Sequence, residues 1–428
     1  MLKKTARTLA LAILAAGLLG CQDRPARESA APPPHAVQRL VVSSEGRLVQ
    51  FDLNTASVGW TYASKADAEG NRNTFADDGT TIYLPFESGK LVAFDAATGE
   101  VRWTHLANTA AGVADAVGDG EGGVTIDPSL RPYYLSRPLI DGERLYIASA
   151  GQPRRFEPRF AVVNRSDGSL VASEGIETNF NLFAPVLCRG NVFVNSAVYL
   201  SKYTRQGVAT SYGLHEDAAF EAPLYAQMQS DGQTLYLGDE RGRFYALPLD
   251  AHGNVAGEGD IMDPQNSFTG RPQVFRWTYR SERYPRLAPS DNGSTALVRG
   301  TLIVGVRQED EKGDALVGLD AASGQERWTY APGQPIRRWA ADEAGVTGDT
   351  EGFVFVLDAQ GRERARYPVD PQLRPLSNVV ALAGGELVFA TEQGIAVVGL
   401  SAPAARLKIA HPFARNEHDT VHAASFEK

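Results

Sequence analysis

Short apolar runs separated by turn residues fill most of the chain, and one stretch shows the pattern best. Leu91 to Asp95 is apolar without clean alternation, which is typical of a strand covered on both faces. In the following turn, Asp95-Ala-Ala-Thr-Gly99, the Asp side chain can accept bonds from the next amides and Gly supplies a positive φ. Residues 100–105 then read as a second strand that carries Trp103. The stretch therefore predicts a hairpin with Asp and Trp eight residues apart.

This hairpin recurs along the chain in full or partial copies. The copies carry the repeat residues Asp52, Trp60, Trp277, Asp320, Gly324, Trp328 and Asp358. A second hairpin of apolar strands precedes nearly every copy, as at residues 185–194. Each unit is thus four short strands averaging about 45 residues, the period of a propeller blade. Eight units account for residue 38 to about residue 413.

The sequence therefore predicts an all-β fold, an eight-bladed β-propeller of four-stranded antiparallel blades. A blade with two apolar faces cannot bury them alone, so blades stack radially and the ring closes. The first unit has no convincing inner strand of its own. We therefore expect residues Thr420 to Phe426 to pair with it and to close the ring through the N- and C-terminal segments.

Residues 1–20 read as a lipoprotein signal peptide. Three cations precede an apolar run from Leu9 to Leu19, which is too short for a comfortable transmembrane helix. The sequence Leu-Leu-Gly-Cys that ends at Cys21 is similar to the lipobox of bacterial lipoproteins, which implies cleavage before Cys21 and lipidation of its thiol. The alternative is an ordinary signal peptide that happens to contain a cysteine.

The residues after the cysteine extend this interpretation. Lipoproteins that lack an Asp after the lipidated cysteine are usually sent to the outer membrane, so Gln22 implies an outer-membrane anchor that faces the periplasm. Residues 21–37 include three consecutive prolines and predict a lipidated N-terminus and flexible tether. Residues 38–428 remain as a single propeller domain.

Net charge limits the classes of molecule that this chain is expected to bind, and cysteine content limits its disulfide chemistry. The formal net charge is −9, and removing the leader with its three cations makes it more negative. This balance weighs against nucleic acid and against an anionic membrane surface as partners. Cys21 and Cys188 are the two cysteines. If Cys21 is lipidated, Cys188 has no partner, and its apolar setting predicts a buried, inert thiol.

The form Asp-x-x-[Thr/Ser]-Gly-x-x-x-Trp, at residues 95–103 and 320–328, resembles the repeat of pyrroloquinoline-quinone-type propellers. In that family the tryptophan lies on the outer strand and packs between blades. The resemblance implies that role, rather than a cofactor contact, for Trp60, Trp103, Trp277 and Trp328. Together with the lipobox, the layout resembles the outer-membrane assembly lipoproteins of the β-barrel assembly machinery. It departs from them in insertions at Leu106 to Ile140 and Ala251 to Val274 and in the degenerate third to fifth blades.

The polar clusters of the sequence do not have the spacing of a known catalytic, cofactor-binding or metal-binding motif. Asp115 to Gly123 could wrap Ca²⁺, but it lacks the alternating ligand spacing of a known loop, so a solvated loop is expected. Three histidines near the C-terminus are spaced wrongly for one metal ion and are expected to be exposed, namely His411, His418 and His422. Two arginine clusters could bind an acidic partner or could be solvated, namely Arg362, Arg364 and Arg366, and Arg154, Arg155 and Arg159.

The resemblance implies a non-enzymatic periplasmic scaffold without a cofactor. Its partners would be other envelope proteins, most specifically the β-barrel assembly machinery. The alternative is a quinone-dependent or other small-ligand-binding propeller. Quinoprotein dehydrogenases have similar repeats but carry an adjacent cysteine pair over the quinone, Ca²⁺ ligands and a catalytic carboxylate, and a lone Cys188 lacks the first of these. Function is therefore expected in the anchor, the insertions and the loops that do not repeat.

Overall fold

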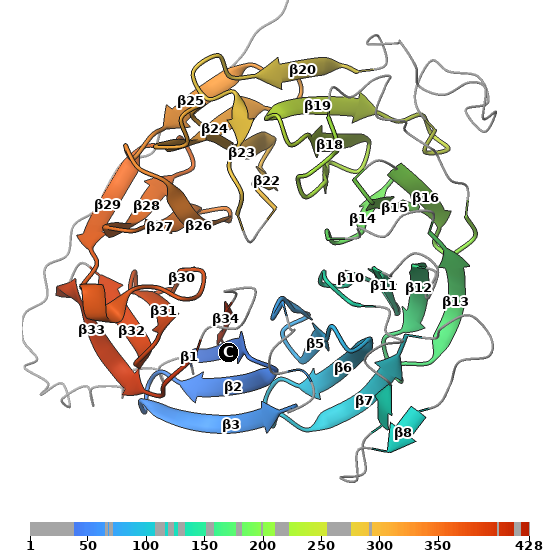
Figure 1. The fold of residues 1–428 in the computed structure, drawn as a ribbon, viewed down its shortest axis with the longest axis horizontal. Coiled ribbons are helices and arrows are strands. Elements are labelled where there is room, and N and C mark those ends of the chain that lie inside the picture. The colour runs from blue at the N-terminus through green and yellow to red at the C-terminus, as the bar shows by residue number, and fades with distance from the viewer. Residues whose placement is uncertain are drawn as a thin grey trace, which may run out of the picture. The chain divides into compact units, whose positions relative to one another are not determined.

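Eight antiparallel sheets surround a common axis in the computed structural model (Figure 1). All of them belong to the unit Val37–Lys428. The structure describes residues 38–64, 67, 72–107, 116–118, 124–126, 133–150, 158–176, 182–197, 200–209, 222–254, 275–290, 293–399, 402–414 and 421–427. The prediction of an eight-bladed propeller is confirmed.

The first four blades follow the chain order. Blade 1 contains β1 (Gln38–Ser44), β2 (Arg47–Asp52), β3 (Ser57–Ala63) and β34 (His422–Glu427). Blade 2 contains β4 (Ala76–Asp77), β5 (Thr81–Pro85), β6 (Lys90–Asp95) and β7 (Val101–Leu106). Blade 3 contains β10 (Leu139–Asp141), β11 (Arg144–Ala148), β12 (Arg159–Asn164) and β13 (Leu170–Gly175), and blade 4 contains β14 (Val186–Cys188), β15 (Asn191–Asn195) and β16 (Leu200–Thr204). The short strands β8 (Ala116–Gly118) and β9 (Val124–Ile126) pair with each other outside the blades.

The other four blades continue the ring. Blade 5 contains β17 (Gln229–Ser230), β18 (Thr234–Gly238), β19 (Arg243–Pro248) and β20 (Trp277–Arg280). Blade 6 contains β21 (Arg286–Leu287), β22 (Thr295–Val298), β23 (Thr301–Arg307), β24 (Asp314–Asp320) and β25 (Glu326–Tyr330). Blade 7 contains β26 (Ile336–Ala341), β27 (Gly345–Thr350), β28 (Phe353–Asp358) and β29 (Glu363–Pro368), and blade 8 contains β30 (Val380–Ala381), β31 (Leu387–Thr391), β32 (Gly394–Gly399) and β33 (Ala402–Ala410).

Two blades depart from the four-stranded pattern within the described residues. Blade 4 shows three strands, and the residues after Ala209, where an outer strand would follow, lie outside the described part. In blade 6 the innermost position is divided, because β21 and β22 pair with opposite ends of β23. Blade 6 therefore has five strands in four positions.

The C-terminal strand closes the ring as the sequence predicts. β34 pairs antiparallel with β1, from Gln38 opposite Glu427 to Ser43 opposite His422. It takes the innermost position of blade 1, beside the first strand of the described chain (Figure 1). The predicted segment, 420–426, and the observed strand differ by one or two residues at each end.

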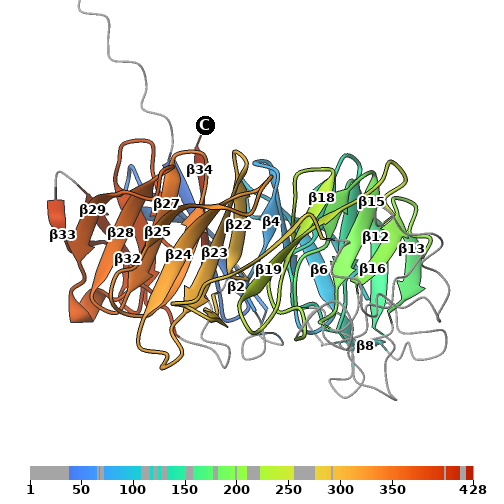
Figure 2. The same ribbon diagram turned by 90° about the horizontal axis from the view of Figure 1, so that it is seen from above.

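The core consists of eight clusters of buried apolar side chains, and each cluster joins two neighbouring blades. Strand β6 shows the cause, because successive side chains of a strand point to opposite faces. Val92 and Phe94 pack toward blade 1, and Leu91 and Ala93 pack toward blade 3. The continuous apolar runs of the sequence thus fill two interfaces at once, and the blades stand side by side (Figure 2).

Helical structure is slight in the described residues. A 3-10 helix spans Pro371–Leu373 and begins at Asp370, whose side chain accepts a bond from the amide of Gln372. Within the described ranges, no helix has the length and apolar character needed to span a bilayer.

Candidate functional site

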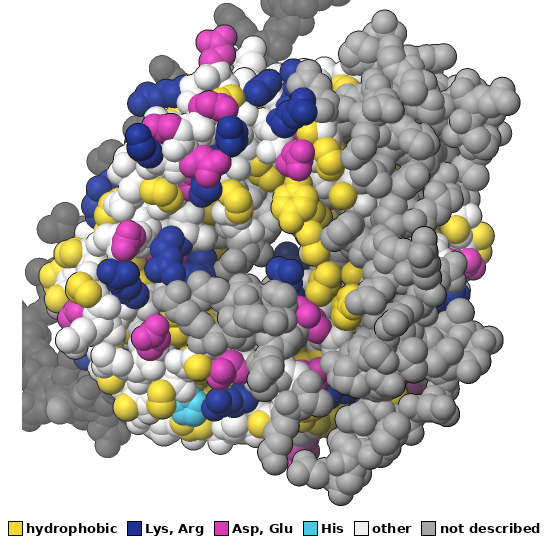
Figure 3. All heavy atoms as spheres, viewed as in Figure 1, with side chains coloured by type: hydrophobic (Ala, Val, Ile, Leu, Met, Phe, Trp, Pro, Cys, Tyr) yellow, Lys and Arg dark blue, Asp and Glu magenta, His cyan; other side chains and the backbone are white. Residues whose placement is uncertain are grey.

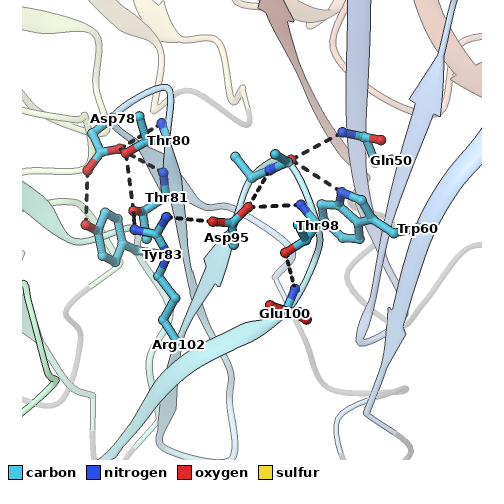
Figure 4. A network of polar contacts seen from close by, with 12 residues as sticks. Gln50, Trp60, Asp78, Thr80, Thr81, Tyr83, Asp95, Thr98, Glu100 and Arg102 are labelled. Carbon is cyan, nitrogen blue, oxygen red and sulfur yellow. Dashed lines mark hydrogen bonds and ion pairs between the residues drawn. The ribbon is translucent and has the colours of Figure 1, made fainter.

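The predicted repeat turn is built around Asp95. Its Oδ1 accepts bonds from the amides of Ala97 and Thr98, each at 2.9 Å. Its Oδ2 accepts a bond from Arg102 Nη2 at 2.7 Å, and Arg102 Nη1 donates to Thr81 Oγ1 at 2.6 Å (Figure 4). The Arg102 hydrogen bond is the main cause that lowers the pKa of Asp95 to about 2. The carboxylate thus fixes the turn and ties it to two strands of blade 2.

Gly99 lets the tryptophan of the neighbouring blade lie against this turn. Its φ is +74°, and a Cβ added there would lie 2.5 Å from Trp60 Cε3. The Trp60 indole Nε1 donates to the Ala96 carbonyl at 3.3 Å, and Gln50 Nε2 donates to the same oxygen at 3.2 Å (Figure 4). Trp60 and Gln50 belong to blade 1, so this contact joins blades 1 and 2. We call such a contact a tryptophan–turn joint.

Three more tryptophan–turn joints follow the same geometry. A Cβ added to the turn glycine would lie 2.5 Å from the ring at Trp103 on Gly168 and 2.6 Å at Trp277 on Gly324, and at Trp328 on Gly361 it would overlap the ring still more closely. Two of these indoles also donate to a turn carbonyl, Trp103 to Arg165 at 3.0 Å and Trp277 to Ala321 at 2.9 Å. The Trp328 indole nitrogen has no hydrogen-bond partner among the residues that the structure describes.

The other predicted aspartates lie in equivalent turns. Asp52 Oδ1 accepts bonds from the amides of Asn54 and Thr55 at 2.8 and 3.0 Å. Asp320 Oδ1 accepts from the amide of Ser323 at 2.8 Å, and Asp358 Oδ1 accepts from the amide of Gln360 at 2.9 Å. These residues are parts of the turns and lie away from the ring axis, so they offer no common site.

A cavity of about 710 Å³ lies inside the ring, and the innermost strands of seven blades contribute to its wall. These strands are β34, β4, β10, β14, β17, β26 and β30. Figure 3 shows one face of the ring, hollowed near its centre, with Lys or Arg side chains beside the hollow. We call this cavity the central channel.

Side chains close much of the channel wall by bonding to the main chain of the next blade. Gln227 Oε1 accepts from the Ala184 amide at 2.9 Å, and its Nε2 donates to the Ala184 carbonyl at 3.1 Å. Asn378 Nδ2 donates to the Ala423 carbonyl, and Asn378 Oδ1 accepts from the Ala423 amide, both at 2.9 Å. Two further bonds of this kind run from Gln229 Nε2 to Thr295 O at 3.2 Å and from Thr347 Oγ1 to Val379 O at 3.0 Å.

The wall formed by blades 1 to 3 is different, because it presents three titratable side chains. They are Asp77 on β4, Arg137 just before β10 and His422 on β34. Neither the Arg137 guanidinium nor the His422 imidazole forms a hydrogen bond or an ion pair with the protein in the described residues. The ring of Phe75 lies edge-on to the His422 ring, with centroids 4.7 Å apart.

Enclosure by the ring shifts the pKa of each of these groups. Desolvation raises the pKa of Asp77 and lowers that of Arg137, and each charge partly offsets the shift of the other. Burial, together with the Arg137 charge, lowers the pKa of His422 to about 4. Arg137 nevertheless keeps an accessible surface, because it faces the channel while protein atoms surround it at longer range. With its pKa at about 4, the His422 imidazole is neutral at pH 7.

Comparison with known families decides the relationship of the chain. The sequence profile described as "Outer membrane protein assembly factor BamB" matches residues 22–256. The chain belongs to the BamB family. No protein among the curated sequences matches it.

Solved structures related to this BamB-family chain have low sequence identity and therefore show the fold alone. BamB from Moraxella catarrhalis is 15% identical in sequence and has a TM-score of 0.52. The alignment covers 83% of this chain and 92% of the BamB chain. Quinohemoprotein alcohol dehydrogenase from Comamonas testosteroni is 11% identical and has a TM-score of 0.54, with an alignment that covers 90% of this chain and 72% of the dehydrogenase. Apo AztD from Citrobacter koseri is 12% identical and has a TM-score of 0.55, with an alignment that covers 92% of this chain and 99% of AztD.

The described residues of this BamB-family chain do not fit the quinone site that the repeat class implies. Cys188 is 1% exposed and lies in the core between blades 4 and 5, away from the channel, and burial raises the pKa of its thiol. Among the described residues, no three His, Cys, Asp or Glu side chains come together to hold a metal ion. Trp339, the tryptophan on an inner strand, is 3% exposed and packs between blades 6 and 7.

The structure corrects the expectation that the C-terminal histidines are exposed. His411 is half-buried, with its ring 5.2 Å from that of Phe51 and 5.1 Å from that of Phe413. His422 is half-buried in the channel, because β34 is an inner strand rather than a free tail. His418 lies outside the described residues.

The predicted arginine and acidic clusters offer little free charge where they are described. Arg362 and Arg364 pair with Asp358 Oδ2 at 2.9 and 2.8 Å, and Arg366 pairs with Glu363 at 2.7 Å. Arg159 donates to Ser173 Oγ at 2.6 Å. The predicted lipidation site Cys21, Arg154 and Arg155, most of the Asp115–Gly123 loop and nearly all of the Ala251–Val274 insertion lie outside the described residues.

Sequence reasoning missed Arg137 and the pairing of each tryptophan with a glycine of the next blade. Arg137 lies within the segment interpreted as an insertion, where no repeat indicated an inner strand. The apolar segment Pro138 to Ile140, directly after Arg137, could have indicated the inner strand that begins blade 3.

Proposed function

We propose that this chain is a non-enzymatic scaffold lipoprotein of the periplasm. It would be anchored by lipid on Cys21 to the outer membrane and would bind other envelope proteins, most specifically in the assembly of outer-membrane β-barrel proteins. The match of residues 22–256 to the BamB family carries the proposal. The lipobox-like sequence before Cys21 supports the anchor.

The geometry of the channel supports a scaffold over a quinone-dependent dehydrogenase. The thiol of Cys188 is buried between blades, and the carboxylates described near the channel do not gather into a metal site. The cores between blades and the four tryptophan–turn joints make a stiff ring, which suits a protein that presents loops to several partners at fixed positions.

Affinity capture from solubilised outer membranes tests the partner. The tag belongs between Gln22 and Ala36, since a C-terminal tag would adjoin β34 and disturb closure of the ring. We expect the core protein of the β-barrel assembly machinery to be enriched over a capture with untagged chain. Failure to enrich it would refute the specific assignment and leave the propeller fold unaffected.

The anchor is tested separately by Cys21→Ser. The wild-type chain should be recovered with outer membranes and carry a diacylglyceryl mass on its first residue, and the variant should lose both. Cys188→Ser is the matched control, because that thiol is buried away from the channel. Recovery of the Cys21→Ser chain in the membrane fraction with an unchanged mass would contradict the anchor.

The enzyme alternative has its own assay. Purified chain is incubated with pyrroloquinoline quinone and Ca²⁺, and alcohol- or sugar-dependent reduction of a dye is measured. We expect neither a retained chromophore nor activity. A bound quinone with substrate-dependent dye reduction would overturn the non-enzymatic part of the proposal.

A further inference from the structure

We propose that the central channel binds a ligand that carries a carboxylate, held by Arg137 against the wall of blades 1 to 3. The binding site consists of Phe75, Asp77, Arg137, Leu139 and His422. These residues come from three blades, one of which contributes through the closing strand β34. We call this set the Arg137 site.

The site is distinguished by polar groups that the protein leaves without hydrogen bonds. Elsewhere on the wall, polar side chains such as Gln227, Gln229 and Asn378 bond to the neighbouring main chain. In the described residues, the guanidinium of Arg137 and the imidazole of His422 have no such partner. At several blades the polar side chains of the wall are therefore used in bonds to the protein, whereas the N–H groups of the Arg137 site remain available to a ligand.

Arg137 supplies the main attraction for a ligand. A guanidinium offers five N–H donors in a planar fork that matches a carboxylate in a bidentate arrangement. Arg137 faces a channel bounded by the inner strands of seven blades, so solvent screens an anion bound to it less than one bound to an arginine on the outer surface. Asp77 stands within electrostatic reach of Arg137, and the two form no ion pair among the described residues; the Asp77 Oδ1 accepts a 3.2 Å bond from the Gly79 amide.

The surrounding charges favour a monoanion. Asp77 and Asp342 both line the channel, so a phosphate dianion would meet two like charges there. A carboxylate carries one charge and can be satisfied by Arg137. His422 is neutral at pH 7, because burial lowers its pKa to about 4, and it can donate or accept one further bond.

The size and lining of the channel fit a small organic body behind that carboxylate. The cavity of about 710 Å³ lies within the range of roughly 300–1,000 Å³ found for small-molecule sites. Leu139, Ile140 and the edge of Phe75 give the apolar part of the wall. The carboxylate could belong to a free small acid or to the C-terminus of a peptide, and the chemistry at Arg137 is the same for both.

This inference does not depend on the scaffold proposal. A scaffold can lack a channel ligand, and a channel ligand can be bound by a ring that has no assembly partner. The test therefore uses purified chain and small probes, so its failure would leave the capture experiment unaffected.

Isothermal titration calorimetry with paired probes tests the Arg137 site. One pair is 3-phenylpropionate and 3-phenylpropionamide, and the other is N-acetyl-trialanine with a free C-terminus and the same peptide as an amide. We expect an acid to bind at least about tenfold more tightly than its amide, the loss that follows from removing a charged hydrogen bond. Tighter binding of phenylpropionate would indicate a free acid, and tighter binding of the peptide acid would indicate a chain end.

Substitutions locate the binding. Arg137→Gln should weaken binding of the acid about tenfold or more, and Arg137→Lys should restore part of it because the charge remains. Arg337→Gln is the matched control, since Arg337 lies on the inner strand β26 of blade 7 but does not line the channel. The proposal is overturned if no acid binds, if acids and amides bind equally, or if Arg137→Gln leaves the affinity unchanged.

Discussion

Gly99→Ala tests the tryptophan–turn joint that joins blades 1 and 2. Gly99 has a φ of +74°, which an alanine adopts only with strain. The new Cβ would lie 2.5 Å from Trp60 Cε3, inside van der Waals contact. The indole must move away, and its bond to the Ala96 carbonyl at 3.3 Å is lost with the movement.

The expected cost has two parts. The left-handed backbone conformation costs an alanine about 1 kcal/mol relative to glycine. Displacement of Trp60 adds about 1–3 kcal/mol, the usual cost of overpacking a well-filled contact. We therefore expect Gly99→Ala to lower the free energy of unfolding by about 2–4 kcal/mol.

Gly300→Ala is the control that separates the two parts. Gly300 has a φ of +71°, and a Cβ added there meets nothing within 4 Å. It should cost only the backbone strain, about 1 kcal/mol. Urea unfolding, followed by far-UV circular dichroism, gives the midpoint and slope for each variant.

A double-mutant cycle with Trp60→Ala measures the contact directly. With the indole removed, Gly99→Ala should cost no more than Gly300→Ala, which corresponds to a coupling energy of about 1–3 kcal/mol. Equal costs for Gly99→Ala and Gly300→Ala in the wild-type background would refute the joint as a source of stability.

Three further changes test other parts of the ring. Asp314→Asn should cost about 3 kcal/mol in urea unfolding, because it breaks a pair in which Arg307 Nε lies 2.7 Å from a fully buried carboxylate. His422→Asn should flatten the pH dependence of the urea midpoint. The pKa of His422 is lowered to about 4 in the folded ring, so the unfolded chain binds the extra proton and stability falls as pH drops from about 6.5 toward 4. Asn378→Ala should cost about 1–2 kcal/mol and raise amide hydrogen exchange in β34, because it removes two 2.9 Å bonds to that strand.

Each of these predictions has a contradicting result. A cost for Asp314→Asn near that of an exposed pair would mean that the ion pair contributes little. Parallel pH profiles for wild type and His422→Asn between pH 6.5 and 4 would contradict the lowered pKa of His422, since His105 and His411, whose pKa values burial also lowers, are unchanged in both chains. Exchange that rises equally in all strands of the Asn378→Ala ring would mean that the bond does not hold β34 in particular.

The local turns could be predicted because their cause lies within a few residues. Asp95 bonds to amides two and three residues later, and the eight-residue interval to Trp103 places the indole on the outer strand. The closing strand could be predicted because the first repeat unit lacks an inner strand. A blade without an inner strand leaves apolar surface and unpaired main-chain groups exposed. Both arguments need only the sequence and the geometry of one blade.

The contacts between blades could not be predicted in the same way. Trp60 lies against Gly99 and Trp103 lies against Gly168, intervals that differ because blade 3 follows a long insertion. The interpretation of His422 was wrong for a related reason. The sequence predicts residues 420–426 as the closing strand, but it does not show that the His422 side chain of that strand faces the enclosed channel, which follows only from the place of β34 inside the ring.

The closing strand β34 connects the stability of the ring with the Arg137 site. Its main chain pairs with β1, and its His422 side chain faces the channel near Arg137, which blade 3 supplies. A ligand that contacts both groups can bind only while β34 is in place, so by linkage it would stabilise the closed ring in proportion to its occupancy. The repeat aspartates cannot provide this effect, because their carboxylates accept bonds within the turns. If the Arg137 site binds its ligand, the strand that closes this propeller therefore responds to a small molecule.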